Sequence, residues 1–178
     1  MKTLREIYHK MGYGYYPTDK GTTHCYIDTY DRLFASFQDQ EINILEVGVS
    51  EGGSIRLFSD YFTKANIYGY DIMNTARPGI FGPHVTYIIK DINKVDPQEF
   101  INIAPTIAID DGSHILADQL LFVKLVYPAM VEGGLLFIED IQDIDKEKTA
   151  FEALGFPMEV IDLRSSGRYD DVLILFKK

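Results

Sequence analysis

Short apolar runs alternate with longer amphipathic segments along most of the chain. Continuous apolar runs predict buried strands, which we expect at residues 42–47, 67–71, 85–89, 106–110 and 134–138. Apolar residues at helical spacing predict helices at residues 2–11, 24–37, 54–62, 115–130 and 146–154. Near-continuous apolar strands separated by helices are typical of a parallel sheet that is covered on both faces.

The pattern changes near the end of the sequence. Residues 159–163 and 171–176 are two further apolar runs with a short polar segment between them. Parallel neighbours need a crossover of about a dozen residues or more, so this short connection favours an antiparallel pair. The predicted fold class is therefore α/β, a doubly wound, Rossmann-like, mostly parallel seven-stranded sheet with an antiparallel C-terminal strand. We expect one domain over residues 1–178, with a short N-terminal helical cover (1–38) and an α/β core (40–178).

Composition excludes several classes of protein. The chain has 178 residues, of which 46% are hydrophobic and 25% charged, as in ordinary globular domains. Its net charge of −10 argues against a nucleic-acid partner, which would need basic patches. No run approaches the roughly 20 apolar residues of a membrane span, and the charged start lacks the apolar core of a signal peptide. We expect a cytoplasmic protein without a membrane or nucleic-acid partner. Its single cysteine, Cys25, cannot form an internal disulfide.

A glycine-bearing loop follows the first predicted strand. Ligands of open α/β sheets bind at the carboxyl ends of strands, where glycines let the backbone approach them closely. A dinucleotide fingerprint needs a glycine where Ser50 stands. Glu46 and Glu51 would also repel a pyrophosphate, which disfavours a nicotinamide-dependent oxidoreductase. The loop predicts a site for a cationic or zwitterionic nucleoside, with a plain strand–helix turn as the alternative.

Two acids stand at the ends of the next strands. Asp71 closes the second predicted strand, where a carboxylate can accept hydrogen bonds from both ribose hydroxyls. Asp91 follows the third and is placed to bind an adenine amino group. Either acid alone is more often a helix cap or a turn residue. Together, beside the glycine loop, they favour a nucleoside pocket.

Four carboxylates follow two later strands. Asp110 and Asp111 end the fourth predicted strand, and Glu139 and Asp140 end the fifth. Adjacent strands lie about 4.8 Å apart, so we expect all four to crowd one small region. A divalent cation removes their repulsion, and Mg²⁺ prefers a few carboxylates together with water. The alternative is that these acids cap helices or pair with Lys and Arg.

The chain resembles a known fold family and, within it, a known group of enzymes. Glu46-x-Gly48-x-x-x-Gly52, Asp71 and the terminal antiparallel pair resemble the class I S-adenosylmethionine (SAM) methyltransferases over about residues 40–178. Three further segments resemble the metal-dependent macrolide-sugar (mycinamicin-type) O-methyltransferases: Thr18-Asp19-Lys20-Gly21 with His24, Tyr26 and Tyr30; residues 109–114 (Ile-Asp-Asp-Gly-Ser-His); and residues 133–140 (Gly-Gly-Leu-Leu-Phe-Ile-Glu-Asp). Members of that group are often longer.

The resemblance implies a Mg²⁺- and SAM-dependent O-methyltransferase that transfers a methyl group to a hydroxyl of a sugar or sugar-containing small molecule. Mg²⁺, or another hard divalent cation, would be held by Asp111, Glu139 and Asp140, and the catalytic residues would be His114 and Asp111. The expected SAM-binding residues are Glu46, Gly48, Gly52, Ser54, Asp71, Asp91, Asp110, Lys20 and His24. Lys20 and His24 have an alternative role, since they can simply pack the second helix over the sheet. Because a core this small leaves little material for a lid, we also expect a homo-oligomer.

His114 stands three residues after Asp111, at the start of a predicted helix. Such a histidine is commonly a cap or surface residue, but beside a metal and a sulfonium it is placed to act as a general base. Tyr15 or Tyr16 would shape the acceptor mouth, and Arg168 and Tyr169 would border it. The alternatives are a catechol-like diol or an amine as acceptor, or a non-catalytic SAM-binding subunit.

Overall fold

The computed structural model describes residues 2–11, 18–165 and 167–178. They form one seven-stranded sheet in the order β3-β2-β1-β4-β5-β7-β6. The first five strands run parallel, and β7 is antiparallel to both of its neighbours. The predicted fold class is confirmed, including the antiparallel end. The strands are β1 (Asn43–Val47), β2 (Asn66–Asp71), β3 (Val85–Ile89), β4 (Ile107–Asp110), β5 (Leu135–Ile138), β6 (Met158–Asp162) and β7 (Val172–Lys177).

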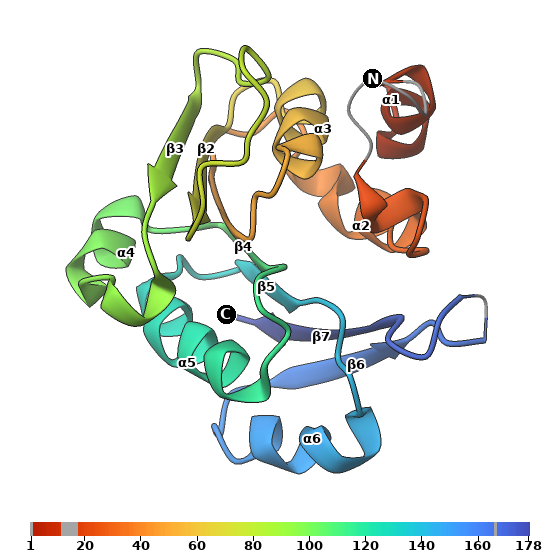
Figure 1. Ribbon diagram of the computed structural model, residues 1–178, viewed down its shortest axis with the longest axis vertical. Coiled ribbons are helices and arrows are strands. Elements are labelled where there is room, and N and C mark those ends of the chain that lie inside the picture. The colour runs from red at the N-terminus through yellow and green to blue at the C-terminus, as the bar shows by residue number, and fades with distance from the viewer. Residues whose placement is uncertain (1, 12–17, 166) are drawn as a thin grey trace.

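Helices cover both faces of the sheet (Figure 1). One face carries α1 (Leu4–Met11), α2 (Ile27–Phe34) and α3 (Gly53–Tyr61). The other carries α4 (Pro97–Ile103), α5 (Leu116–Val126) and α6 (Ile144–Glu152). The short 3-10 helix η1 (Asp19–Gly21) precedes α2 and leads the chain towards the carboxyl ends of the strands. Among the described residues, no helix is long and apolar enough to cross a bilayer.

Strand alternation divides the core into two layers. In β4, Ile107 and Ile109 face the α1–α3 layer, whereas Ala108 faces the α4–α6 layer. Side chains two residues apart in a strand point to the same face, so each buried strand contributes to both layers. In the first layer, an aromatic cluster of Tyr30, Phe34, Phe58 and Phe137 joins α2 to α3 and β5.

Three helices differ from expectation. The sequence pattern missed α4, which begins at Pro97 after a capping box formed by Asp96 and Glu99. The second helix is shorter than residues 24–37, because its last turn is a 3-10 helix, Ala35–Phe37. The fifth helix ends at Val126 rather than near residue 130, because Pro128 lies in the 3-10 helix that follows.

Phe34 tests how firmly the N-terminal helices are attached to the sheet. Its ring is fully buried, with centroids 4.8 Å from Tyr30 and 5.6 Å from Phe137. We expect Phe34→Ala to lower the free energy of unfolding by about 3–5 kcal/mol, measured by urea denaturation. Ile101→Ala, on α4 with 55% of the residue exposed, is the control and should change it by less than about 1 kcal/mol. Equal losses in the two variants would show that the aromatic cluster does not anchor the helices.

Candidate active site

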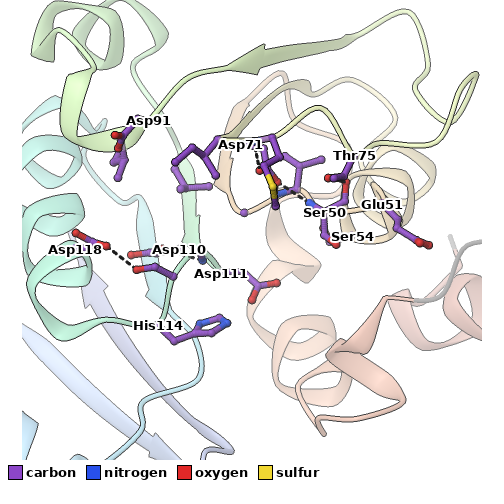
Figure 2. A pocket seen from close by; sticks show the side chains of 18 of the residues that line it. Ser50, Glu51, Ser54, Asp71, Thr75, Asp91, Asp110, Asp111, His114 and Asp118 are labelled. Atoms are coloured by element: carbon purple, nitrogen blue, oxygen red, sulfur yellow. Dashed lines mark hydrogen bonds between the residues drawn. The ribbon is translucent and has the colours of Figure 1, made fainter.

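A cavity of about 700 Å³ lies at the carboxyl ends of β1, β2 and β4 (Figure 2). The strand order reverses between β1 and β4, which is where open α/β sheets bind ligands. The volume falls within the range of small-molecule sites. The cavity reaches from the glycine loop to His114, so it brings the predicted nucleoside site and part of the predicted metal site into one space.

Most of the predicted pocket residues line this cavity, but not all. Those that line it are Gly48, Ser54, Asp71, Asp91, Asp110, Asp111 and His114. Those that do not are Glu46, Gly52, Lys20, His24, Glu139 and Asp140. Sequence reasoning missed Ile72, Met73 and Asp118, which also line it. Ile72 and Met73 directly follow Asp71. Their position just after an acid at the end of a strand could have indicated that they line the cavity.

The glycine loop is held by backbone contacts. Gly48 has φ +86°, and a Cβ added there would lie 1.8 Å from the backbone oxygen of Asp111. This glycine therefore lets the loop after β1 touch the loop after β4. Asp71 supports the same loop, because its Oδ2 accepts hydrogen bonds from the backbone N–H groups of Val49 (2.9 Å) and Ser50 (2.8 Å).

Asp91 serves two structural purposes. Its carboxylate caps the 3-10 helix η3 (Ile92–Lys94) by accepting a hydrogen bond from the backbone N–H of Asn93 at 3.0 Å. The same residue lines the cavity, where Figure 2 shows it beyond Asp110. Asp91 can therefore cap a short helix and line the cavity at the same time.

The cavity wall is acidic. Seven carboxylates line it, whereas Lys90 is the one lysine or arginine among its described lining residues. Burial raises the pKa of Asp110 to about 7, and its Oδ1 accepts a hydrogen bond from the backbone N–H of Gly112. A wall of this charge attracts a cationic ligand and repels a pyrophosphate. The acids concerned are Asp19, Glu51, Asp71, Asp91, Asp110, Asp111 and Asp118.

A buried lysine holds three carboxylates on the α1–α3 side of the sheet. Lys20 follows Asp19 in η1, and its Nζ lies 2.6 Å from Asp111 Oδ2, 2.8 Å from Glu139 Oε2 and 3.5 Å from Glu46 Oε1. Burial lowers the pKa of Lys20, but attraction by Asp111, Glu139 and Glu46 outweighs it and raises the pKa well above its usual value. Lys20 is therefore a fixed cation.

The three carboxylates respond to burial in the same direction. Burial raises the pKa of Glu46 to about 7 and that of Glu139 well above its usual value, while Lys20 opposes both shifts. Burial also raises the pKa of Asp111, again against the effect of Lys20. Asp110 does not join this group. Its side chain follows the alternation of Ala108 to the opposite face, so the expectation that all four acids crowd together was wrong for Asp110.

Two tyrosines of the N-terminal segment bind the acids after β5. Tyr30 donates a hydrogen bond to Glu139 Oε1 at 2.5 Å, and Tyr26 donates one to Asp140 Oδ1 at 2.6 Å. Both phenols are fully buried, and burial raises the pKa of each, so they remain donors. Both tyrosines belong to the N-terminal segment whose sequence resembles the O-methyltransferases, but that resemblance does not predict these bonds.

Asp111, His114 and Asp140 form an outer corner beside the cavity. One ligand atom from each lies within 4.8 Å of the others. His114 and Asp140 have φ of +57° and +54°, a strained conformation for residues other than glycine that is common at functional sites. His114 precedes the helix α5 rather than starting it. Its buried Nδ1 has no hydrogen-bond partner among the described residues.

The chemistry of this corner suits a hard divalent cation, since two carboxylates and an imidazole converge there. Glu139, the third predicted ligand, lies next to Asp140 but uses its oxygens differently. Its Oε2 accepts a hydrogen bond from Lys20, and its Oε1 accepts one from Tyr30. The structure thus places Asp111 and Asp140 in the corner and Glu139 behind them.

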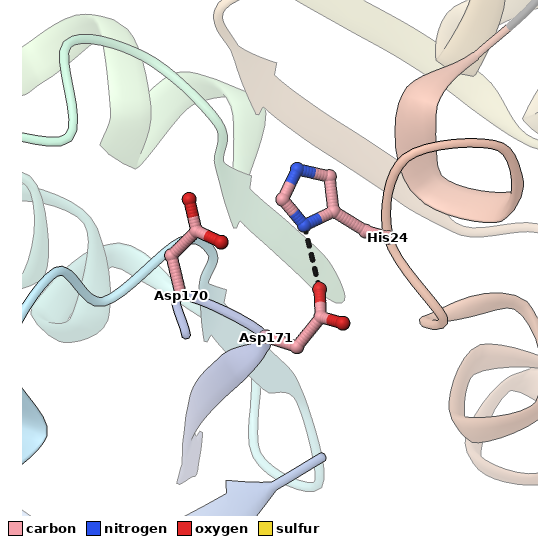
Figure 3. Close-up of side chains that lie close together, drawn as sticks. All are labelled: His24, Asp170 and Asp171. Carbon is pink, nitrogen blue, oxygen red and sulfur yellow. Dashed lines mark hydrogen bonds and ion pairs between the residues drawn. The ribbon is translucent and has the colours of Figure 1, made fainter. Parts of the chain in front are cut away.

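His24 belongs to a neighbouring network of side chains (Figure 3). Its Nδ1 lies 2.7 Å from Asp171 Oδ1, and its Nε2 lies 3.4 Å from Asp140 Oδ2. Although Asp170 is close, both of its oxygens accept hydrogen bonds from the Arg168 guanidinium. Cys25 donates to Asp171 Oδ2, and burial raises the pKa of this thiol to about 11. We interpret this network as structural support for Asp140.

Of the four residues expected around an acceptor, the structure describes only Arg168 and Tyr169. Tyr15 and Tyr16 lie outside the described residues. Tyr169 is 64% exposed, and its hydroxyl donates a hydrogen bond to Gln142 Oε1 at 3.1 Å. Gln142 in turn donates to the backbone oxygen of Asp140. Neither Arg168 nor Tyr169 lines the cavity, but Tyr169 is connected to the outer corner through Gln142.

Comparison with solved structures identifies the class of protein. A MycE methyltransferase from the mycinamycin biosynthetic pathway, in complex with Mg and SAH, matches 99% of this chain and 55% of its own chain, with a TM-score of 0.75 and 25% identity. A putative rRNA methylase from Clostridium thermocellum shares the fold alone, with a TM-score of 0.64 and 13% identity. The chain has the class I methyltransferase fold.

Sequence relatives define the group more closely. An 8-demethyl-8-α-L-rhamnosyl tetracenomycin-C 2'-O-methyltransferase of Streptomyces olivaceus is 33% identical over 137 residues, which cover 70% of this chain and 35% of the relative. A mycinamicin VI 2''-O-methyltransferase of Micromonospora griseorubida is 32% identical over 71% of this chain and 34% of its own length. No protein-family model matches the chain. The chain is a homologue of the macrolide-sugar O-methyltransferases, and it spans about a third of the length of these curated relatives.

Gly48 tests the contact between the two loops. Gly48→Ala places a Cβ against the backbone oxygen of Asp111 in addition to straining a positive φ, so we expect it to lower the free energy of unfolding by about 3 kcal/mol or more. Gly155→Ala is a matched control, because Gly155 has φ +77° and nothing within 4 Å of an added Cβ. It should lose only about 1–2 kcal/mol in the same urea titration. Similar losses would mean that the loops do not depend on this contact.

Proposed function

We propose that this chain is a Mg²⁺- and SAM-dependent O-methyltransferase that methylates a hydroxyl of a sugar or sugar-containing small molecule. The observation that carries the proposal is a single acidic cavity that runs from the glycine loop to Asp111 and His114, beside Asp140. The MycE complex with Mg and SAH and the sugar O-methylation carried out by the relatives support it.

In this proposal the cavity holds SAM. Asp71 would bind the ribose through Oδ1, which accepts one hydrogen bond from the backbone N–H of Met73 and keeps a lone pair, and Asp91 and Asp110 would line the base end. Gly48 and Ser54 bring the backbone of β1 and α3 close to the ligand, while Glu46 and Gly52 shape the loop from behind. Lys20 and His24 act through the acids that they contact. Bound SAM supplies an electrophilic methyl group on a sulfonium.

Asp111, Glu139 and Asp140 would hold Mg²⁺. A bound divalent cation lowers the pKa of an acceptor hydroxyl and orients neighbouring hydroxyls. Tyr26 and Tyr30 hold the two carboxylates after β5 in place through their hydrogen bonds. The segment from η1 to α2 thereby serves as a cover that is part of the site.

His114 would act as the general base. It accepts the hydroxyl proton while the acceptor oxygen bonds to the methyl carbon and the carbon–sulfur bond breaks, leaving S-adenosylhomocysteine. Its ring is within the cavity wall, and its Nε2 lies 3.8 Å from Asp140 Oδ2, so the ring is held beside the proposed metal ligands. Our sequence-based expectation of a cytoplasmic homo-oligomer stays a prediction.

Replacing His114 tests the base. His114→Ala should reduce turnover by about 10²- to 10⁴-fold, while the affinity for SAM stays within about twofold. Turnover is measured as S-adenosylhomocysteine release with a rhamnosylated polyketide as acceptor, and affinity by calorimetry. His84→Ala, an exposed histidine before β3, is the control. Near-normal turnover in His114→Ala would refute the assignment.

Removing divalent ions tests the metal and separates the alternatives. In EDTA we expect turnover to fall by at least about 10²-fold and to return when Mg²⁺ is added, because the acceptor hydroxyl is then no longer acidified. Metal-independent turnover would exclude a metal-bound diol, whether sugar or catechol, and favour an amine acceptor. Tight SAM binding without turnover of a sugar, a catechol or an amine would instead indicate a non-catalytic subunit.

A further inference from the structure

Lys20 has no direct role in the proposed methyl transfer, yet it occupies an unusual position. Its side chain is fully buried, whereas lysine is rarely fully buried in proteins unless it is paired. It does not line the cavity, so it is not placed to contact the ligands that the cavity would hold.

The three carboxylates around Lys20 come from three adjacent strands. Glu46 lies in β1, Asp111 follows β4 and Glu139 follows β5, and these strands are neighbours in the order β1-β4-β5. The ammonium group therefore lies beneath the end of the middle strand. Asp111 is shared, since its Oδ2 contacts Lys20 while the residue also belongs to the outer corner with His114 and Asp140.

Few donors other than Lys20 compensate Glu46 and Glu139, the two carboxylates at the inner end of the cluster. Glu46 Oε2 accepts a hydrogen bond from Ser54, but its Oε1 has no hydrogen-bond partner among the described residues and depends on the charge of Lys20 at 3.5 Å. Without Lys20, this buried carboxylate and Glu139 would face each other across Asp111. Leaving a buried charge uncompensated is strongly destabilising.

We propose that Lys20 is a positioning residue that serves as a permanent cation at the inner end of the acidic cluster, so that the cluster binds one divalent cation at its outer end. The inference rests on the metal site of the proposed function. Lys20 aligns Asp111 and Glu139 before the ion arrives and limits the negative charge that the ion must balance. A divalent cation can partly replace the missing charge when Lys20 is removed.

A structural role without a charge role is the alternative, in which Lys20 only fills space and supplies hydrogen bonds. Restoring the net charge at a second position separates the two. Glu46→Gln removes one negative charge, keeps the side-chain shape and can still accept the hydrogen bond from Ser54. Glu46 is not among the proposed metal ligands, so the outer corner is left intact.

The experiment measures thermal unfolding in EDTA and in Mg²⁺, without SAM or acceptor, for the wild type, Lys20→Met, Glu46→Gln and the double variant. In EDTA we expect Lys20→Met to lower the Tm by about 10 °C. Its Mg²⁺-induced rise in Tm should be roughly double that of the wild type, because the ion meets more uncompensated charge. The double variant should regain most of the Tm that Lys20→Met loses in EDTA. Its Mg²⁺-induced rise in Tm should be close to that of the wild type. Lys148→Met, which removes an exposed pair with Glu152, is the control and should change neither value.

Each outcome bears on the proposal. A Mg²⁺-induced rise that is equal in Lys20→Met and the wild type, or a double variant that is no more stable than Lys20→Met, would overturn it while leaving the proposed metal site intact. The absence of any rise in the wild type would contradict the metal site and overturn the inference with it. If Lys20→Met does not fold in EDTA, the double variant decides: folding restored by Glu46→Gln supports a charge role, and continued failure to fold refutes it.

Discussion

Several carboxylates are buried at the ends of neighbouring parallel strands, and the structure depends on the positive charge and hydrogen-bond donors that compensate them. Glu46, Asp111 and Glu139 all meet at Lys20, and Tyr26, just before α2, and Tyr30, within it, add hydrogen bonds to the acids after β5. Burial of such groups is tolerated only when opposite charge and donors are supplied at short range. The segment from η1 to α2 supplies both, so its attachment to the sheet and the assembly of the site are one event.

The pleat of the strands separates two kinds of acid. Asp110 and Asp111 are neighbours in sequence and both line the cavity, but strand alternation leaves only Asp111 in contact with Lys20. The cavity and the outer corner therefore meet at one strand end, and Asp111 is the carboxylate that belongs to both. Gly48 makes this possible, because the absence of a Cβ lets the two loops touch behind the cavity.

Much of the fold could be predicted from the sequence, because apolar runs of strand length and the short connection before β7 both reflect burial and chain geometry. The helix α4 was missed since it is short and partly polar, although its capping box was visible at Asp96. The cavity residues after strand ends were predicted where a glycine or acid marked them. The contacts of Lys20 with Asp111 and Glu139, and of Tyr30 with Glu139, were not predicted, because these pairs lie 91 to 119 residues apart and no local pattern encodes such contacts.

The contact between His24 and Asp171 joins parts of the chain that are 147 residues apart. Asp171 directly precedes β7, which inserts between β5 and β6 and is therefore not an edge strand. During synthesis, the N-terminal segment must therefore wait for nearly the whole sheet before Asp140 acquires its final support. Contacts of such long sequence separation form late in folding. A chain that ended before β7 would consequently lack Asp171, and with it the contact that holds His24 against Asp140.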